Sequence, residues 1–93
     1  MGIHETLKAL SDPVRRNILE LLKEGRLSAG DIAKQFDLSA ATISHHLSQL
    51  KKAGLIAETK YKNFIYYEIS LTVLEDVLAW ISQFTGGHEY EYK

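Results

Sequence analysis

Two short helical patterns, separated by only three residues, limit the fold of this chain more than any other feature. The break between them is Asp37-Leu38-Ser39, and its serine is a favourable N-cap for the helix that follows. Apolar residues recur at helical spacing on both sides of the break: Ile32, Ala33 and Phe36 before it, then Ile43, Leu47 and Leu50 after it. Two helices joined this tightly predict a helix-turn-helix.

Two further helices are predicted before this pair. Ile3 to Leu10 is compatible with a short helix. Asp12-Pro13 then provides an N-cap followed by proline at the first helical position, and the pattern that begins there ends at Gly25. The first helix of the pair starts at Ser28, whose spacing to Asp31 predicts a capping box.

The spacing of apolar residues changes from about 3.6 to about 2 after Gly54. Leu55 to Lys60 and Phe64 to Ile69 are rich in β-branched and aromatic residues, and they flank Tyr61-Lys62-Asn63, which predicts a hairpin. A last helix follows, from about Val73 to Phe84. The order α-α-α-α-β-β-α predicts a mainly α chain with a small β-hairpin (α+β), which is a winged helix-turn-helix.

Length and composition fit one small domain. We expect it to span residues 1–85, with Gly86-Gly87 ending the last helix and residues 86–93 forming a flexible C-terminal tail. The chain has no cysteine, which excludes disulfides, thiolate metal sites and thiol nucleophiles. No apolar run approaches the roughly 18–20 residues that cross a bilayer, and the N-terminus lacks a signal-peptide pattern. We therefore expect a cytoplasmic protein without membrane insertion.

The net charge of −1 conceals a segregation of charge along the chain. Residues 8–62 contain ten Lys or Arg and six Asp or Glu, giving +4. Residues 63–93 contain one lysine and five acids, giving −4, and Glu5 supplies the remaining −1. Such asymmetry indicates a basic working surface in the longer, N-terminal part, as in proteins that bind nucleic acid.

The second helix of the pair carries no acid on its outer face. When residues 39–53 are projected at about 100° per residue, the apolar stripe points inward and small hydrogen-bonding side chains point outward. Such side chains read base edges or bind phosphate, whereas a carboxylate would repel the DNA backbone. The residues predicted to contact DNA here are Ser39, Ala41, Thr42, Ser44, His45, Ser48, Gln49 and Lys52. An ordinary solvated polar face is the alternative.

The hairpin supplies a second contact with DNA. Lys60, Lys62 and Asn63 lie at its tip, where they suit phosphate contact beside the main groove. Tyr61 and Phe64 either pack at the base of the wing or contact the DNA backbone, and we expect packing. Phosphate contacts carry no sequence information, so base reading falls on the helix.

The last helix is apolar on more than one side, wider than the stripe of about 100° that packing within one domain needs. Thr72 and Glu75 predict a capping box at its start. A homodimer through the first and last helices would cover the surplus, whereas a fuller intramolecular core is the alternative. The predicted interface consists of Ile3, Leu7, Leu10, Val73, Val77, Trp80, Ile81 and Phe84. A twofold dimer presents two reading helices about 34 Å apart, which matches a palindromic DNA site.

The sequence resembles the ArsR family of bacterial winged-helix repressors over nearly its whole length. The matching segments are LSDPVRRNILELL (10–22), LSAGDIAKQFDLSAATISHHLSQLKKAGLI (27–56) and FIYYEI (64–69). Within the family, the TVLxD…W…F pattern of the last helix is similar to that of the SdpR-like autorepressors. The resemblance implies a homodimer through the first and last helices that represses by occupying its operator. It also implies that Ser44 and His45 lie on the DNA-reading helix.

Many members of that family sense metals, but the ligand positions differ here. Where arsenic and cadmium sensors have thiolates, this chain has Ser28 and Gly30, which are not soft donors. Where zinc sensors pair Asp and His on the last helix, residues 71–84 contain no histidine. We therefore expect no metal site and no cofactor. An improvised site of His4 with His88 or Glu89 is the alternative.

Enzymatic motifs are absent from the sequence: there is no Ser/His/Asp arrangement, phosphate-binding glycine loop or metalloprotease motif. We therefore expect a transcriptional repressor and not an enzyme. Its partners would be double-stranded operator DNA, a second copy of the chain and a possible protein antagonist. A winged helix used only for protein interaction, or a metal sensor with a non-standard site, are the alternatives.

Overall fold

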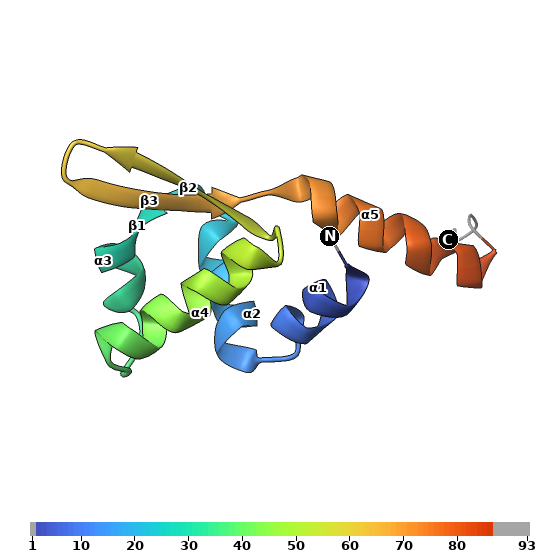
Figure 1. Ribbon diagram of the computed structural model, residues 1–93, viewed down its shortest axis with the longest axis horizontal. Helices are drawn as coiled ribbons and strands as arrows, with labels where there is room; N and C mark the ends of the chain where they lie inside the picture. The colour runs from blue at the N-terminus through green and yellow to red at the C-terminus, as the bar shows by residue number, and fades with distance from the viewer. Residues whose placement is uncertain (1, 87–93) are drawn as a thin grey trace.

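The computed structural model describes residues 2–86, so the predicted tail lies outside the described residues apart from Gly86 (Figure 1). The predicted order of helices and hairpin is confirmed, with one additional strand. The elements are α1 (Ile3–Leu10), α2 (Pro13–Leu22), β1 (Leu27–Ser28), α3 (Ala29–Ala33), α4 (Ala40–Lys52), β2 (Ile56–Tyr61), β3 (Phe64–Ile69), α5 (Leu71–Ser82) and a 3-10 turn at Gln83–Thr85.

Three helices begin at the side-chain caps that the sequence predicts. The Asp12 carboxylate accepts hydrogen bonds from the Val14 and Arg15 N–H groups at 2.8 and 3.2 Å. Ser28 and Ser39 cap α3 and α4 through hydroxyl groups that accept from the backbone three residues on, both at 3.1 Å. Each cap satisfies an otherwise unpaired helix-end donor and fixes where the helix starts.

The predicted capping box at the start of the last helix is wrong. Helix α5 begins at Leu71, and its N-cap residue Ser70 makes no side-chain capping hydrogen bond. The Ser70 N–H instead donates to the Leu55 carbonyl at 3.0 Å. The end of the sheet therefore sets the start of this helix, because strand β3 runs directly into it.

The sheet has three antiparallel strands in the order β1-β3-β2, so β1 adds a third strand to the predicted hairpin. Strand β1 pairs Leu27 with Tyr67, and its two residues are too short to show an alternating pattern in the sequence. The pairing of Tyr61 with Phe64 leaves a turn of only Lys62 and Asn63. Lys62 has a φ of 56°, as the first central residue of a tight hairpin turn requires.

The core lies between the inner face of the sheet and helices α2, α3 and α4. Its fully buried large apolar side chains are Ile18, Ile32, Ile43, Leu50 and Leu55. Gly54 follows α4 with a φ of +78°, and a Cβ at this position would lie 2.7 Å from Val73 Cγ2. Glycine is therefore required both for the helix end and for the close approach of α5.

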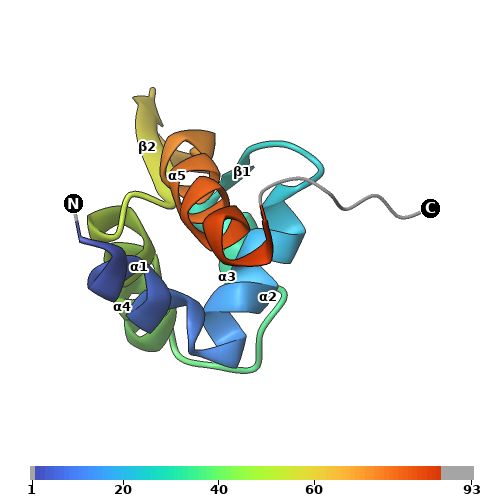
Figure 2. The same cartoon turned by 90° about the vertical axis from the view of Figure 1, so that its right-hand side faces the viewer.

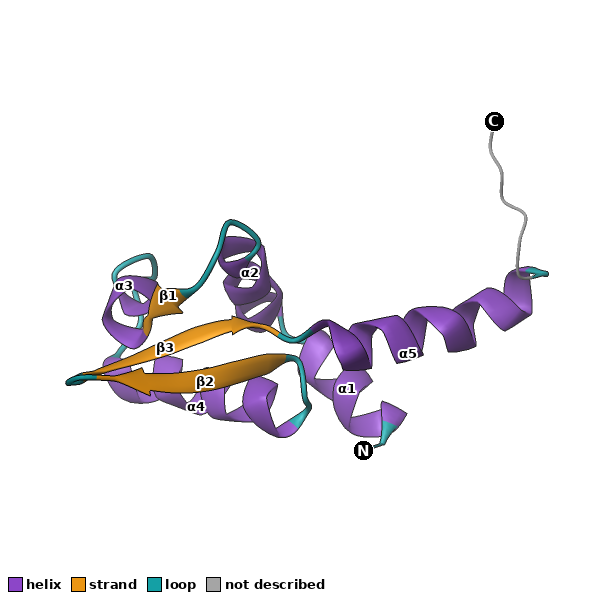
Figure 3. Cartoon of the chain, turned by 90° about the horizontal axis from the view of Figure 1, so that it is seen from above, coloured by secondary structure: helices purple, strands orange, loops and turns teal. Residues whose placement is uncertain are grey.

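Helix α5 leaves this core and projects away from it, which gives the chain extents of 46 × 24 × 22 Å (Figures 1 and 3). Only the first turns of α5 pack against the core. Their side chains Val73 and Val77 are 9% and 8% exposed. Seen end-on, α5 lies between α1 and the sheet (Figure 2). The same view and Figure 3 place α4 and β2 on one side of the molecule and α2 and β1 on the other.

Candidate nucleic-acid interface

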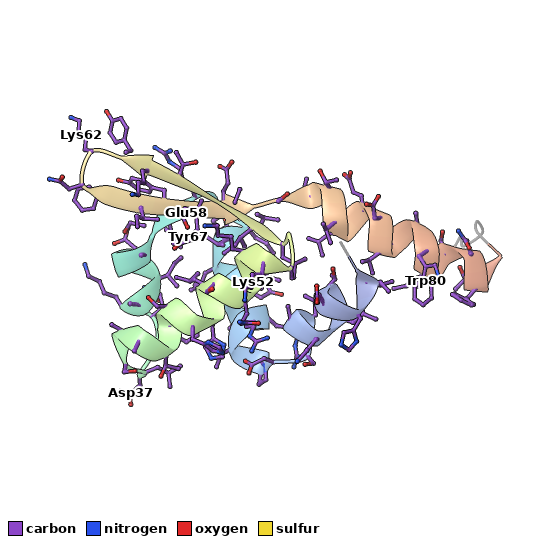
Figure 4. The ribbon with its side chains drawn as sticks, in the orientation of Figure 1. Asp37, Lys52, Glu58, Lys62, Tyr67 and Trp80 are labelled. Carbon is purple, nitrogen blue, oxygen red and sulfur yellow. The ribbon has the colours of Figure 1, made fainter. Side chains whose placement is uncertain are left out.

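The outer face of α4 is open to solvent as the helical projection predicts. Ser44, His45 and Ser48 are exposed, whereas Ile43, Leu47 and Leu50 are buried. Ser39, Ala41, Thr42 and Lys52 are exposed as well. Gln49 differs because it is half-buried and lines a hollow together with residues of α1. The nearest acid before the helix is the exposed Asp37, at the opposite end of α4 from Lys52 (Figure 4).

The neighbouring histidines of α4 have different environments. His45 is exposed, but His46 is only 9% exposed and accepts a hydrogen bond at Nδ1 from Arg15 Nε at 3.1 Å. This bond ties α4 to α2 directly behind the exposed face. Nothing in the sequence indicates that Arg15, 31 residues earlier, is the partner of His46. His45 therefore stays exposed on the outer face of α4, while His46 attaches the helix to α2.

The wing brings three predicted contact residues to its tip. Lys60, Lys62 and Asn63 are all exposed, and Lys62 lies at the end of the hairpin (Figure 4). The tip extends beyond α3 in two perpendicular views (Figures 1 and 3). The structure thus separates two groups of predicted DNA contacts, one along α4 and one at the wing tip.

An ion pair that the sequence does not signal joins the end of α4 to the first half of β2. Lys51 Nζ, in the last turn of α4, lies 3.0 Å from Glu58 Oε1 on β2. Tyr67 lies beside Glu58, its cross-strand partner (Figure 4). Burial of Tyr67, reinforced by the Glu58 charge, raises the pKa of its hydroxyl group. Lys51 and Glu58 are seven residues apart, and the chain changes from helix to strand between them. No periodic pattern in the sequence therefore indicates this contact.

Two aromatic residues of the wing differ from expectation. Tyr61 and Phe64 were expected to pack at the base of the wing, but they are 53% and 57% exposed and pair with each other across the hairpin at its tip. The base of the sheet is filled instead by Ile56, Leu27 and Ile69, so it offers these rings no place.

The predicted dimer residues fall into two sets. Val73 and Val77 are covered by the chain's own core, which leaves them little surface for a partner. Ile3 and Leu10 are partly buried against the same core. The exposed members are Leu7, Trp80, Ile81 and Phe84, and the structure adds Leu71 and Leu78, which are 59% and 65% exposed. Trp80 lies on the projecting part of α5 (Figure 4).

Metal ligands do not converge within residues 2–86, where no group of three or more His, Cys, Asp or Glu side chains is placed to hold an ion. The alternative site of His4 with His88 or Glu89 involves residues outside the described part of the chain. No helix among residues 2–86 is long and apolar enough to cross a membrane.

A helix-turn-helix whose second helix exposes one face, followed by a β-hairpin that joins β1 in a three-stranded sheet, defines a winged helix-turn-helix protein. Residues 12–58 match the sequence profile described as "Bacterial regulatory protein, arsR family". The chain is also 48% identical over 82 residues to the transcriptional repressor SdpR of Bacillus subtilis (strain 168), covering 88% of this chain and 91% of that protein. It belongs to the ArsR family of bacterial regulatory proteins.

Solved structures agree with this assignment. The crystal structure of an ArsR family transcriptional regulator superposes with a TM-score of 0.84 at 26% identity, covering 90% of this chain and 87% of the other. A winged helix-turn-helix domain of Mycobacterium bovis, described as homodimeric and DNA-binding, shares the fold with a TM-score of 0.73 at 24% identity, covering 98% and 87%. The relatives are transcriptional regulators, which confirms the prediction of a non-enzymatic protein.

Proposed function

We propose that this chain is a transcriptional repressor that binds a palindromic operator as a homodimer. The observation that carries the proposal is the exposed, acid-free face of α4, which the Arg15–His46 hydrogen bond holds against α2. Thr42, Ser44, His45 and Ser48 would contact base edges, because their hydroxyl and imidazole groups donate and accept hydrogen bonds in the major groove. The base-contacting side chains of α4 are bordered by the other predicted DNA contacts of this helix, Ser39, Ala41, Gln49 and Lys52.

Affinity would come mainly from phosphate contacts. The candidate phosphate contacts are exposed and lie at two separate places on the surface. These are the wing tip, with Lys60, Lys62 and Asn63, and the end of α4, with Lys52. Lysine–phosphate contacts release counterions, so binding should weaken steeply as salt rises. Lys62→Ala should weaken all sequences alike and reduce the salt slope by about one unit.

The homodimer is supported by the apolar surface of α5. Leu78, Trp80 and Ile81 lie on the part of α5 that projects from the core, and Phe84 lies in the 3-10 turn that follows it. These side chains are 44% to 72% exposed. An exposed patch of this kind on a monomer is uncommon and marks an interaction surface. A twofold pairing through α1 and α5 would cover it and place two α4 helices in successive major grooves, about 34 Å apart.

Independence from metals is supported by the chemistry of the donors. Ser28 and Gly30 offer no soft ligand, and α5 contributes Glu75 and Asp76 without histidine. Zinc titrated into the complex with DNA should therefore release nothing. Release at micromolar zinc would favour a metal sensor with a non-standard site.

Repression, in place of activation, is suggested by the similarity to SdpR, which is named a transcriptional repressor. We place the protein in the bacterial cytoplasm because its operator is there, and we assign residues 1–85 to one DNA-binding and dimerisation domain. Without a metal, the signal that lifts repression would be a protein antagonist, or the protein would regulate only its own promoter.

Selection of bound fragments from random duplex DNA tests the proposal. We expect one enriched motif with inverted repeats about one helical turn apart, centre to centre. Recovery of fragments without a shared motif would contradict sequence-specific binding and favour a winged helix used for protein interaction. Recovery of a single half-site would contradict binding as a homodimer but not sequence-specific binding.

A further inference from the structure

The function proposed above gives no role to a polar hollow of about 370 Å³ that lies between α1 and the end of α4. The C-terminal end of α4, which carries Lys52, lies beside α1 (Figures 1 and 4). The polar walls of the hollow are His4, Glu5 and Lys8 from α1, with Gln49 and Lys52 from α4. Sites for small molecules occupy about 300–1,000 Å³, so the size of this hollow suits a small ligand.

Two alanines at the floor make room for the hollow. Ala9 and Ala53 line it, are both 3% exposed and carry no side-chain atom beyond Cβ. The fully buried Thr6 hydroxyl group donates to the Ala53 carbonyl at 3.5 Å, which joins α1 to the end of α4 at this point. The hollow is therefore formed by the packing of two helices with small residues between them.

The main polar side chains around the hollow have no partner within residues 2–86. Gln49 is half-buried, yet its side-chain amide makes no hydrogen bond to these residues. Lys8 and Lys52 form no ion pair there, since the two lysines that do are Lys23 and Lys51. Polar groups withdrawn from solvent normally have a hydrogen-bond partner, so an unpaired amide in a hollow indicates a place for a ligand.

The hollow and the proposed dimer use different sides of α1. The residues of this helix predicted to form the dimer are Ile3, Leu7 and Leu10. At about 100° per residue, Glu5 and Lys8 point to the opposite side of the helix. The proposed dimer contact therefore does not use the α1 wall of the hollow.

The lining indicates the chemistry of the ligand. Its two lysines outnumber its one glutamate, and lysine ammonium groups bind phosphate as point charges. The Gln49 amide and the Glu5 carboxylate accept hydrogen bonds from hydroxyl groups, which an inorganic anion does not supply in the same number. An aromatic or long apolar ligand would find only alanine methyl groups to pack against. The lining therefore favours a small, hydrophilic molecule that carries both phosphate and hydroxyl groups.

We propose that this hollow binds a phosphate ester of a small polyol, such as a sugar phosphate, and that the bound ligand weakens operator binding. Lys8 and Lys52 hold the phosphate, while Gln49 and Glu5 hold hydroxyl groups. Gln49 and Lys52 are also predicted DNA contacts, so ligand and operator compete for them, and each lowers the affinity for the other. A small molecule thus joins the signals considered above. Its effect on operator binding rests on the proposed function, whereas ligand binding itself does not.

The first measurement maps ligand binding by NMR on the isotope-labelled chain without DNA. The probes are glycerol 3-phosphate, ribose 5-phosphate and glucose 6-phosphate, with inorganic phosphate and glucose as controls at equal ionic strength. We expect at least one polyol phosphate to shift the Gln49 side-chain amide and the backbone signals of Lys8 and Ala53. It should bind more tightly than inorganic phosphate, and glucose should shift none of these signals. This mapping needs no variant, so it decides the matter even if a variant fails to fold.

The second measurement compares two lysine variants. Lys8→Gln removes one phosphate-binding cation and should weaken binding of the polyol phosphate by about tenfold. Lys34→Gln is the matched control, because Lys34 is equally an exposed lysine but lies after α3, outside the hollow. The control should bind the ligand as the wild type does.

The third measurement tests the effect on DNA. Saturating polyol phosphate should weaken operator binding by about tenfold in wild type and in Lys34→Gln, compared with the same ionic strength set by sodium chloride. Lys8→Gln should bind the operator as the wild type does without ligand, because Lys8 is not among the predicted DNA contacts. It should respond to ligand only at about tenfold higher concentration.

Three results would overturn the proposal. One is the absence of shifts at Gln49, Lys8 and Ala53 with every polyol phosphate. Another is equal binding of polyol phosphate and inorganic phosphate, or equal binding by Lys8→Gln and wild type, which would indicate a general attraction of anions to exposed lysines. The third is unchanged or stronger operator binding in the presence of ligand. If the mapping succeeds but the chain selects no operator from random duplex DNA, the ligand site stands and the proposed DNA binding falls.

Discussion

Arg15 on α2 donates a hydrogen bond from Nε to Nδ1 of His46 on α4, at 3.1 Å. His46 is 9% exposed and stands next in sequence to the exposed His45, with 5.8 Å between the two ring centres. One histidine therefore faces the solvent where DNA would lie, while its neighbour attaches the helix to the rest of the fold. Identical side chains at adjacent positions thus have separable roles.

This separation predicts opposite effects of two matched substitutions. His46→Ala should lower the free energy of unfolding by about 1–3 kcal/mol, because it removes a buried ring and leaves Arg15 without its acceptor. His45→Ala should leave it within about 0.5 kcal/mol of wild type, as surface substitutions do. Urea unfolding of both variants measures the difference. Equal losses of stability would contradict the assigned roles.

Glu58 pairs with a lysine in the last turn of α4, the helix proposed to read DNA. Its carboxylate holds Lys51 Nζ at 3.0 Å, so Lys51 is engaged within the protein. Glu58→Gln should release Lys51 toward phosphate, strengthening binding to unrelated duplex DNA and raising the salt slope by up to about one unit. The control is Glu20→Gln, which breaks the Glu20–Lys23 pair on α2 and should leave both quantities unchanged. An unchanged slope in Glu58→Gln would show that Lys51 does not reach DNA.

Trp80→Asp should convert the dimer into a monomer, because it places a carboxylate within the apolar surface of α5. Sedimentation should then give the chain mass of 10.5 kDa. Leu38→Asp is a matched control, since Leu38 is 42% exposed and Trp80 44%, but Leu38 lies in the turn between α3 and α4. The control should remain dimeric. A dimeric Trp80→Asp variant would refute the interface through α5.

Asp12 should make stability sensitive to acid. Burial alone would raise the pKa of its carboxyl group, but hydrogen bonds from the Arg15 and Val14 N–H groups, with His46 and Arg15 nearby, lower it below 3.8. Since the pKa is lower in the folded state, the ionised group stabilises the fold above its unfolded pKa, and this stabilisation is lost as the pH falls through the folded value.

Two variants separate the charge of Asp12 from its cap. Asp12→Ala should cost about 1 kcal/mol at pH 7, the usual contribution of an N-cap. Asp12→Asn keeps an acceptor, so it should retain most of this stability and show a smaller decline below about pH 4. Urea unfolding at pH 7 and at acid pH measures both. A decline in Asp12→Asn as steep as in wild type would assign the acid sensitivity to other carboxylates.

Local chemistry in the sequence accounts for most of the fold. The caps at Asp12, Ser28 and Ser39 depend on residues at most three positions away, and they were predicted correctly. Strand β1 was missed because it has two residues and is defined only by pairing with β3. Likewise, the start of α5 depends on a backbone hydrogen bond to Leu55, which lies in a distant part of the chain.

The candidate site shows the same division. A helical projection identifies which side chains of α4 share a face, so the exposure of Ser44, His45 and Ser48 followed from spacing alone. The spacing of apolar residues does not show whether the chain's own core or a partner covers a given helix face. That is why Val73 and Val77 were assigned to a partner although the chain's own core covers them, and why Tyr61 was expected to pack.

The central claim is that the exposed face of α4 reads DNA sequence. The most direct measurement is the ratio of affinities for the selected operator and for a shuffled duplex at one salt concentration, in wild type and in S44A/H45A. We predict a ratio of about a thousandfold or more for wild type. It should fall by roughly tenfold to a hundredfold in S44A/H45A, with affinity for shuffled DNA retained. An equal ratio in the two proteins would contradict the claim.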